Sequence, residues 1–289
     1  MNAAPMPEVA GVHHRWVRAP GATIHVAEAG PADGPTFVLL HGWPQHWWIW
    51  RDVIGPLADH GWRVLAMDLR GCGWSEAPAR DYRKATMARD ASAVLDTLGV
   101  AEAHVAGHDW GGWVAQLLAV AEPDRVRALT VLDIASLWTD ASVFARHLHR
   151  FAYQPVIAMP GLGPAIERSR LLWAQMARNG LPADAVGPYR DAMRDPAHAR
   201  AGSRFYRDFL GREARASATR DRAGARIEAP VSALLGMDDP VIRPPMVTSL
   251  AGHAASFELE EVPGCGHFIV DEAPDVVLRH LLAFHERHR

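Results

Sequence analysis

An aspartate lies at the centre of a tight Gly-x-Asp-x-Gly turn. Residues 105–112 read Val-Ala-Gly-His-Asp-Trp-Gly-Gly, between an apolar run and a helical pattern. Only small residues such as Gly107 and Gly111 let a strand and a helix pass closely enough to lift Asp109 above a sheet edge. A carboxylate is ionised at neutral pH and attacks without a base. Asp109 is therefore expected to attack a saturated carbon that bears a leaving group, as in an epoxide or alkyl halide, and to form an ester that water must open.

Three further motifs are placed where they could supply partners for Asp109. His41–Pro44 (His-Gly-Trp-Pro) closes an early apolar run, so the backbone N–H groups of Trp43 and Trp110 are expected to form an oxyanion hole. A glycine-rich loop, residues 68–75, follows the next apolar run. Near the C-terminus, Gly-Cys-Gly-His-Phe places His267 on a loop before the last helical pattern.

Strand and helix patterns alternate around these motifs. Strands are predicted at residues 16–17, 22–28, 36–41, 63–68, 103–108, 126–133, 231–236 and 257–262, and several of these runs are β-branched and continuously apolar, as in buried parallel strands. Helices are predicted at residues 47–60, 86–98, 113–121 and 274–288. Residues 138–228 have helical spacing broken by prolines and show no strand pattern. We therefore expect an α/β core domain of residues 1–137 and 229–289, with residues 138–228 as an inserted helical cap and the site between them.

Composition excludes several classes of function. A formal net charge of −3 gives no electrostatic reason to bind nucleic acid or an anionic membrane. Two cysteines cannot make a disulfide framework, and the 16 histidines include no H-E-x-x-H motif, so neither metal nor cofactor is expected. Met1–Gly11 has no signal-peptide pattern, and no apolar run reaches the ~18 residues of a membrane span. A cytoplasmic enzyme, monomer or homodimer, is the expectation.

Taken together, the motifs resemble the α/β-hydrolase superfamily, and within it the branch of epoxide hydrolases and dehalogenases with an aspartate nucleophile. The resemblance covers nearly the whole chain through His-Gly-x-Pro, Asp-x-Arg-Gly-x-Gly-x-Ser, Gly-His-Asp-Trp-Gly-Gly and Gly-x-Gly-His. It implies a mostly parallel eight-stranded sheet flanked by helices, with a helical cap. It also implies that Asp109 is the nucleophile and that His267 is the base that activates water.

The resemblance leaves two positions for the acid that orients the histidine. Asp239 follows a predicted strand at the position most of the superfamily uses, and it is favoured. Asp133 ends the strand after the Asp109 turn, where some relatives place their acid.

Epoxide hydrolases also use two cap side chains to hold and protonate the epoxide oxygen. Phe-Tyr-Arg at residues 205–207 resembles one of these, which makes Tyr206 the expected donor. The second position has no clean counterpart within residues 146–153, where His147, His149 and Tyr153 all remain open.

Two other functions compete with epoxide hydrolysis. A haloalkane or haloacid dehalogenase would use the same aspartate, and the Trp110 indole N–H would cradle the halide. Haloalkane dehalogenases usually have Asn or Glu in place of Trp43, and haloacetate dehalogenases have carboxylate-clamping arginines where this chain has Trp110 and Trp113. The other alternative is a hydrolase fold kept only as a ligand-binding module. No member of the expected triad is missing, which favours an enzyme with a small hydrophobic epoxide or halide as its substrate.

Overall fold

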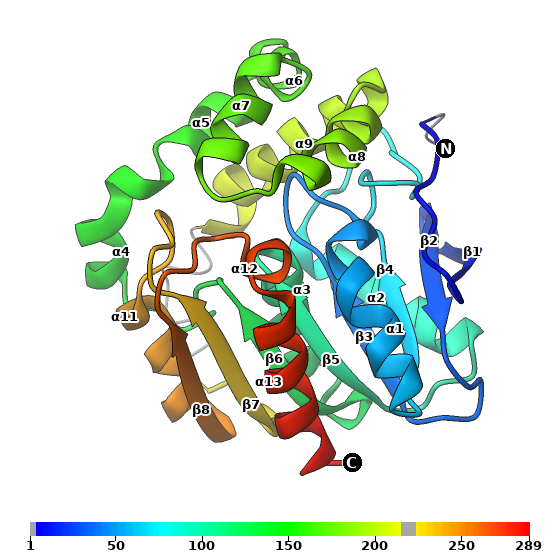
Figure 1. Ribbon diagram of the computed structural model, residues 1–289. Coiled ribbons are helices and arrows are strands. Elements are labelled where there is room, and N and C mark those ends of the chain that lie inside the picture. Colours follow the sequence, from blue (N-terminus) through cyan, green and yellow to red (C-terminus); the bar gives the residue numbers. More distant parts are fainter. Residues whose placement is uncertain (1–3, 215–223) are drawn as a thin grey trace.

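The computed structural model describes residues 4–214 and 224–289 and contains one eight-stranded sheet (Figure 1). Its strand order is β1-β2-β4-β3-β5-β6-β7-β8. The pairs β1–β2 and β2–β4 are antiparallel and all others are parallel. The strands are β1 His13–Ala19, β2 Ala22–Ala29, β3 Thr36–Leu40, β4 Arg63–Met67, β5 Ala103–His108, β6 Val126–Leu132, β7 Ile227–Gly236 and β8 Ala254–Val262. The predicted eight-stranded, mostly parallel sheet is confirmed.

Three strands begin earlier than their sequence pattern predicted. β8 starts at Ala254 rather than Phe257. β1 starts at His13 rather than Trp16, because it is an edge strand whose mostly exposed side chains are polar. β7 starts at Ile227 rather than Val231. Its first residues include Glu228 and Pro230, a composition that is not typical of a strand, and its pairing with β8 is irregular there.

Helices cover both faces of the sheet (Figure 1). α1 (Arg51–Asp59) and α13 (Pro274–Glu286) pack together on one face, and α2 (Lys84–Thr97) and α3 (Trp110–Ala121) pack together on the other. α1 follows a single 3₁₀ turn, Trp47–Trp50, where one continuous helix was predicted. α3 begins directly after Asp109, earlier than its predicted start at residue 113, because the strand-to-helix turn leaves no intervening loop.

A layer of short helices lies over the carboxyl edge of the sheet (Figure 1). Its helices are α4 Ala141–His147, α5 Tyr153–Ala158, α6 Leu162–Glu167, α7 Arg170–Arg178, α8 Ala183–Met193 and α9 Pro196–Asp208, with a 3₁₀ turn at Leu148–Phe151 and a π-helical turn at Phe209–Glu213. Residues 215–223 of the expected cap lie outside the described part. Among the residues that the structure describes, no helix is long and apolar enough to cross a membrane. The layer faces the strand ends that carry the expected site residues.

Candidate active site

Asp109 occupies a strained turn between β5 and α3. Its φ is +48°, a left-handed value that a residue with a side chain adopts only when the surroundings impose it. A Cβ added to Gly107 would lie 2.4 Å from the Gly111 carbonyl oxygen, so neither neighbour of the turn can carry a larger residue at this approach. Asp109 holds the N-cap position of α3, yet its side chain makes no capping hydrogen bond. The turn therefore presents the carboxylate to the space above the sheet.

Two loops contact this carboxylate. The backbone N–H of Trp43, after β3, donates to Asp109 Oδ1 at 2.9 Å. His267 Nε2, after β8, lies 3.6 Å from Asp109 Oδ2. The two carboxylate oxygens thus have different partners, a backbone donor for one and an imidazole for the other.

The other imidazole nitrogen of His267 bonds to Asp239. His267 Nδ1 donates to Asp239 Oδ2 at 2.8 Å, and the backbone N–H groups of Val241 and Ile242 donate to Asp239 Oδ1 at 2.5 and 3.0 Å. Asp239 is fully buried, so both of its oxygens have protein donors in place of water. The structure brings Asp109, His267 and Asp239 together, with the imidazole between the two carboxylates.

Asp133 lies close to these three residues but does not bond to the histidine. Its Oδ1 accepts from the Gly236 backbone N–H at 2.8 Å. Burial and the negative charge of Asp239 raise the pKa of Asp133 well above its usual value, which favours its protonated form. The geometry gives the orienting position to Asp239.

The charges of the site favour an ion pair in the resting state. Burial alone would lower the pKa of His267, but the carboxylates of Asp239 and Asp109 raise it well above its usual value. Burial would likewise raise the pKa of Asp109, but His267 and a hydrogen bond from the Trp110 backbone N–H hold it below the usual value. Asp109 is therefore an anion beside an imidazolium at neutral pH.

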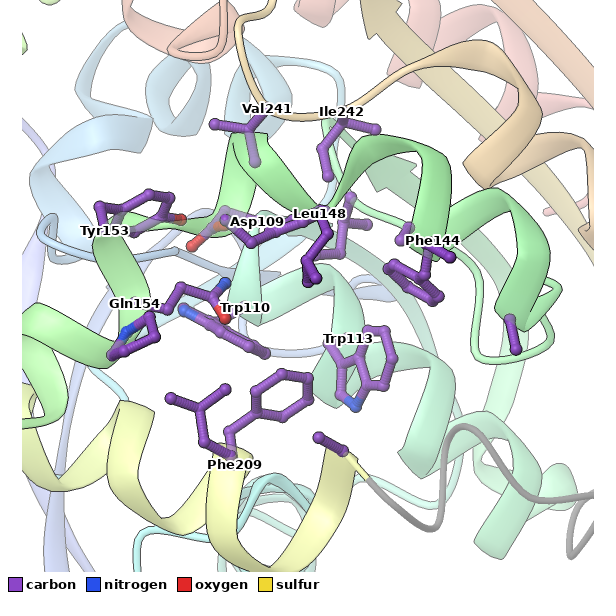
Figure 2. A pocket seen from close by; sticks show the side chains of 18 residues that line it. Asp109, Trp110, Trp113, Phe144, Leu148, Tyr153, Gln154, Phe209, Val241 and Ile242 are labelled. Atoms are coloured by element: carbon purple, nitrogen blue, oxygen red, sulfur yellow. The ribbon is translucent and has the colours of Figure 1, made fainter.

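Two buried tyrosines of the upper layer meet near Asp109. The rings of Tyr153 and Tyr206 lie 5.8 Å apart, and the Tyr206 ring also packs against those of Trp43 and Trp110 at 5.1 and 5.6 Å. Figure 2 shows the Tyr153 side chain pointing toward Asp109. Burial, with the nearby Asp109 charge, raises the pKa of both hydroxyls, so both stay protonated. Of the two histidines also considered for this position, His149 is exposed and His147 bonds to its own helix, so neither joins the tyrosines.

Two cavities open on either side of Asp109 and Tyr153, which line both of them. The first, of about 340 Å³, has an almost wholly apolar wall that includes Trp110, Trp113 and Phe209 (Figure 2). The second, of about 540 Å³, is lined by Trp43 and His267 and also by polar side chains: Arg150, Gln175 and Asn179. A substrate carbon bound at Asp109 can thus carry substituents in two directions.

Residues 35–274 match the α/β hydrolase fold family. The chain belongs to the α/β hydrolase fold family. A soluble epoxide hydrolase from Corynebacterium sp. (strain C12) is 30% identical over 94% of this chain and 97% of its own length. The AB hydrolase superfamily protein YfhM from Bacillus subtilis (strain 168) is 29% identical over 95% and 98%. The solved structure of epoxide hydrolase A from Mycobacterium thermoresistibile is 26% identical, covers 94% of this chain and 98% of its own, and has a TM-score of 0.80. The chain is an epoxide hydrolase-like enzyme of this family.

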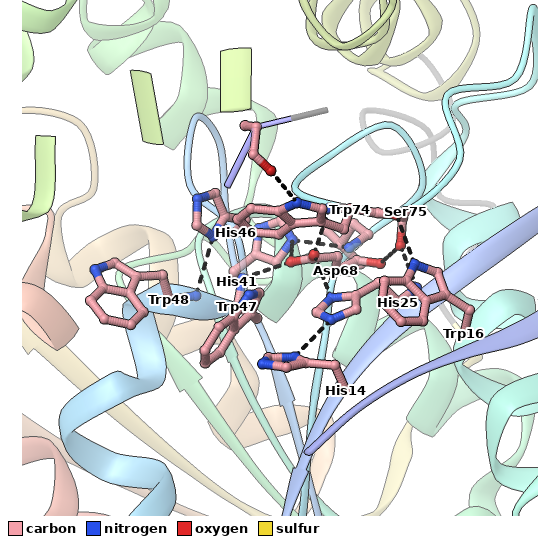
Figure 3. Close-up of polar contacts among 12 residues, drawn as sticks. His14, Trp16, His25, His41, His46, Trp47, Trp48, Asp68, Trp74 and Ser75 are labelled. Atoms are coloured by element: carbon pink, nitrogen blue, oxygen red, sulfur yellow. Dashed lines mark hydrogen bonds and ion pairs between the residues drawn. The ribbon is translucent and has the colours of Figure 1, made fainter. Parts of the chain in front are cut away.

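A buried polar network in this α/β hydrolase supports the loop that carries Trp43 (Figure 3). Asp68, after β4, accepts from the Trp47 and Trp74 backbone N–H groups at 2.7 and 2.9 Å and pairs with His25 Nδ1 at 2.7 Å. His41 accepts from the Leu69 backbone N–H at 2.9 Å. These bonds join the His-Gly-Trp-Pro loop to the glycine-rich loop of residues 68–75, which explains why the two motifs occur together.

His108 and the tryptophans of residues 43–50 lie beside the site or in the core. His108 bonds through Nε2 to the His267 carbonyl at 2.7 Å and thus supports the histidine loop. Trp43 lines the second cavity, while Trp47 and Trp50 are fully buried and Trp48 is half-buried.

Sequence reasoning missed two residues of this region. Gln154 lines the first cavity beside Tyr153, and its adjacency to a tyrosine in the 146–153 stretch was the only available signal. Lys84 is buried behind Trp110, and nothing in its sequence context marks it.

Proposed function

We propose that this hydrolase opens epoxides to vicinal diols through an ester on Asp109. The observation that carries the proposal is the pair of buried, protonated tyrosines, Tyr153 and Tyr206, beside an ionised Asp109. An epoxide needs both groups: a carboxylate that attacks carbon, and an acid that receives the charge forming on oxygen. A halide leaving group needs no proton, which makes the tyrosine pair superfluous for dehalogenation.

Ring opening uses the two oxygens of Asp109 differently. Oδ1 is held by the Trp43 N–H, so Oδ2 attacks the ring carbon in line with the breaking C–O bond. The released oxygen takes its proton from a tyrosine, Tyr153 or its partner Tyr206. The first product is a hydroxyalkyl ester on Asp109, with the ester carbonyl oxygen already in the oxyanion hole.

Ester formation itself prepares His267 for the second step. Because the Asp109 charge raises the pKa of His267, esterification removes part of that effect and lowers the pKa. The proton that His267 then loses balances the one that the tyrosine gave up. Neutral His267, oriented by Asp239, takes a proton from water as the water attacks the Asp109 carbonyl carbon. The Trp43 and Trp110 N–H groups stabilise the oxyanion, each donor contributing about 10²–10³ in rate.

Intact-mass spectrometry of His267→Gln tests this proposal. With no base to activate water, the ester should accumulate after incubation with styrene oxide, giving an adduct equal in mass to the whole epoxide. 1-Bromobutane and a haloacetate serve as parallel substrates. The double variant Asp109→Ala/His267→Gln is the matched control and should show no adduct.

Each result assigns the reaction differently. An epoxide adduct that Tyr206→Phe forms more slowly supports the proposal. An alkyl adduct from the halides alone would replace it with dehalogenation. No adduct from any substrate, in folded protein, would overturn the ester mechanism and favour a ligand-binding role.

A further inference from the structure

Lys84 is a buried cation in an aromatic cage at the junction of the sheet domain and the helices above it. Its side chain, at the start of α2, is fully buried. The ammonium lies 4.3 Å from the centre of the Trp110 ring, 4.5 Å from that of Phe205 and 5.5 Å from that of Phe209. It donates a hydrogen bond to the Phe205 carbonyl at 2.7 Å. Cations over aromatic faces are attracted by the ring electrons, so the cage orients these rings around one charge.

The charged partner of Lys84 comes from the π-helical turn after α9. Glu213 Oε2 lies 3.9 Å from the ammonium, and Glu213 Oε1 accepts from the Lys84 backbone N–H at 2.8 Å. Such a buried pair adds little to stability, because removing both charges from water offsets most of their attraction. Apolar side chains in place of both Lys84 and Glu213 would be about as stable. Stability alone therefore does not account for this pair.

The two groups that the ammonium holds each adjoin a proposed catalytic group. Trp110 directly follows Asp109 and supplies a backbone N–H to its carboxylate. The Phe205 carbonyl belongs to the peptide bond with Tyr206. Figure 2 shows the rings of Trp110 and Phe209 forming one wall of the apolar cavity. The lysine thus lies behind that wall. It contacts the Trp110 ring, which belongs to α3 of the sheet domain, and it donates a hydrogen bond to the Phe205 carbonyl of α9 in the layer above.

We infer that Lys84 is a positioning residue for ring opening, which fixes Tyr206 relative to Asp109 by binding the Trp110 ring and the Phe205 carbonyl with one buried ammonium. The inference rests on the proposed function. Its effect falls on the first chemical step, because Tyr206 acts only while the C–O bond breaks. A misplacement of about 1 Å in such a pair can cost about 10²-fold in rate.

The charge of Lys84 gives this role a pH signature. Burial lowers the pKa of Lys84 to about 8, against the opposing effects of Glu213, Asp208, Asp109 and Cys72, which all face it. Below this pH the ammonium is charged and holds both groups. Above it the neutral amine keeps a weaker hydrogen bond and loses its attraction to the rings. Ester formation should accordingly slow between pH 8 and 9.5.

The test measures the rate of adduct formation with styrene oxide in the His267→Gln parent and in the same parent carrying Lys84→Met. Methionine keeps the length and volume of the side chain without charge. We expect Lys84→Met to slow ester formation by at least about tenfold, with the half-saturating epoxide concentration within about threefold. Its Tm should fall, because the buried Glu213 and the Phe205 carbonyl lose the ammonium. Arg83→Met, at the exposed neighbouring residue that pairs with Asp81, is the matched control and should leave the rate unchanged.

Lys84→Arg and the pH profile keep the inference testable if Lys84→Met folds poorly. Arginine stays charged at pH 9.5, so its rate should not fall between pH 8 and 9.5 as that of the parent does. Equal rates for the parent and Lys84→Met, or the same alkaline decline in Lys84→Arg, would overturn the positioning role. No adduct in the parent itself would instead contradict the proposed function, so the two failures are distinguishable.

Discussion

His267 and His285 are both buried histidines at the carboxyl end of the chain, yet the protein gives them different charge states. His267 lies between the carboxylates of Asp239 and Asp109, which raise its pKa despite burial. His285 bonds to His104 Nδ1 at 2.9 Å and to the Thr130 hydroxyl at 2.8 Å. Burial, with the neighbouring histidines, lowers the pKa of His285 well below the usual value. The residue type is the same, and its partners decide whether it is a cation poised for proton transfer or a neutral structural link.

The neutral histidine belongs to a chain of hydrogen bonds beneath α13. From Thr130 the chain continues to the Ser232 hydroxyl at 2.7 Å, then to His280 at 3.1 Å, and ends at Glu260, 2.7 Å from His280. It joins α13 to β5, β6, β7 and β8. The proposed site at the carboxyl edge of the sheet depends on its charged groups, whereas this chain docks a helix through hydrogen bonds between buried polar groups that end at the Glu260 carboxylate. Substitutions in the two regions should therefore affect different measurements.

The largest effect is expected at Asp239. Asp239→Asn removes the strongest influence that raises the pKa of His267, and it disfavours the orientation in which His267 faces Asp109. Steady-state turnover should fall by about 10⁴-fold, the loss seen for a comparable Asp→Asn change in serine enzymes. Rapid-quench mass spectrometry should show the Asp109 ester accumulating, because hydrolysis slows more than ring opening.

Asp133→Asn is the control for that experiment. Asp133 bonds to the Gly236 backbone N–H rather than to His267, and its raised pKa favours the protonated form, so turnover should change by less than about tenfold. A larger loss for Asp133→Asn than for Asp239→Asn would assign the orienting role to Asp133.

At His285 the expected effect is on stability and on its pH dependence. His285→Leu leaves His104 and Thr130 without their buried partner, which should cost about 3 kcal/mol in the free energy of unfolding and leave turnover unchanged. The folded-state pKa lies below the unfolded value of about 6.5, so the wild type loses stability as pH falls below 6.5. The variant should lose up to about 1.4 kcal/mol less per pH unit in that range.

Urea unfolding at pH 7.5, 6.0 and 5.0 measures both quantities. His13→Gln, at an exposed histidine, is the control and should leave the pH dependence as it is. An unchanged acid slope in His285→Leu would show that His285 is not kept neutral.

The smallest effect is expected at Thr130. Thr130→Val keeps the shape of the side chain but removes the hydroxyl that links His285 to Ser232. The free energy of unfolding should fall by about 1–2 kcal/mol, because only one hydroxyl is lost and its two neighbours keep their other partners. Measured turnover of styrene oxide should be that of the wild type. A drop in turnover would mean that the chain under α13 is coupled to the site.

The sequence predicted β3 to β6 well because these strands are mostly apolar and buried. It placed β1 and the start of β7 poorly, since an edge strand such as β1 tolerates polar residues and the first residues of β7 include a proline. Asp109, His267, Trp43 and Trp110 follow from local motifs whose glycines and turns have few alternative conformations. The choice between Tyr153 and His149 does not, because a cap helix can point either residue at the site.

The chemistry available to this chain can be predicted from its motifs: an aspartate on a tight turn, a histidine on a late loop, and a sheet whose strand ends bring such loops to one edge. The charge of these groups and the residues that join them depend on packing. Burial and neighbouring charge act between segments distant along the chain, so the pKa values of Asp133 and His267 are raised and Lys84 meets Trp110 and Phe205. No local pattern encodes those distances; the packing of the folded chain sets them.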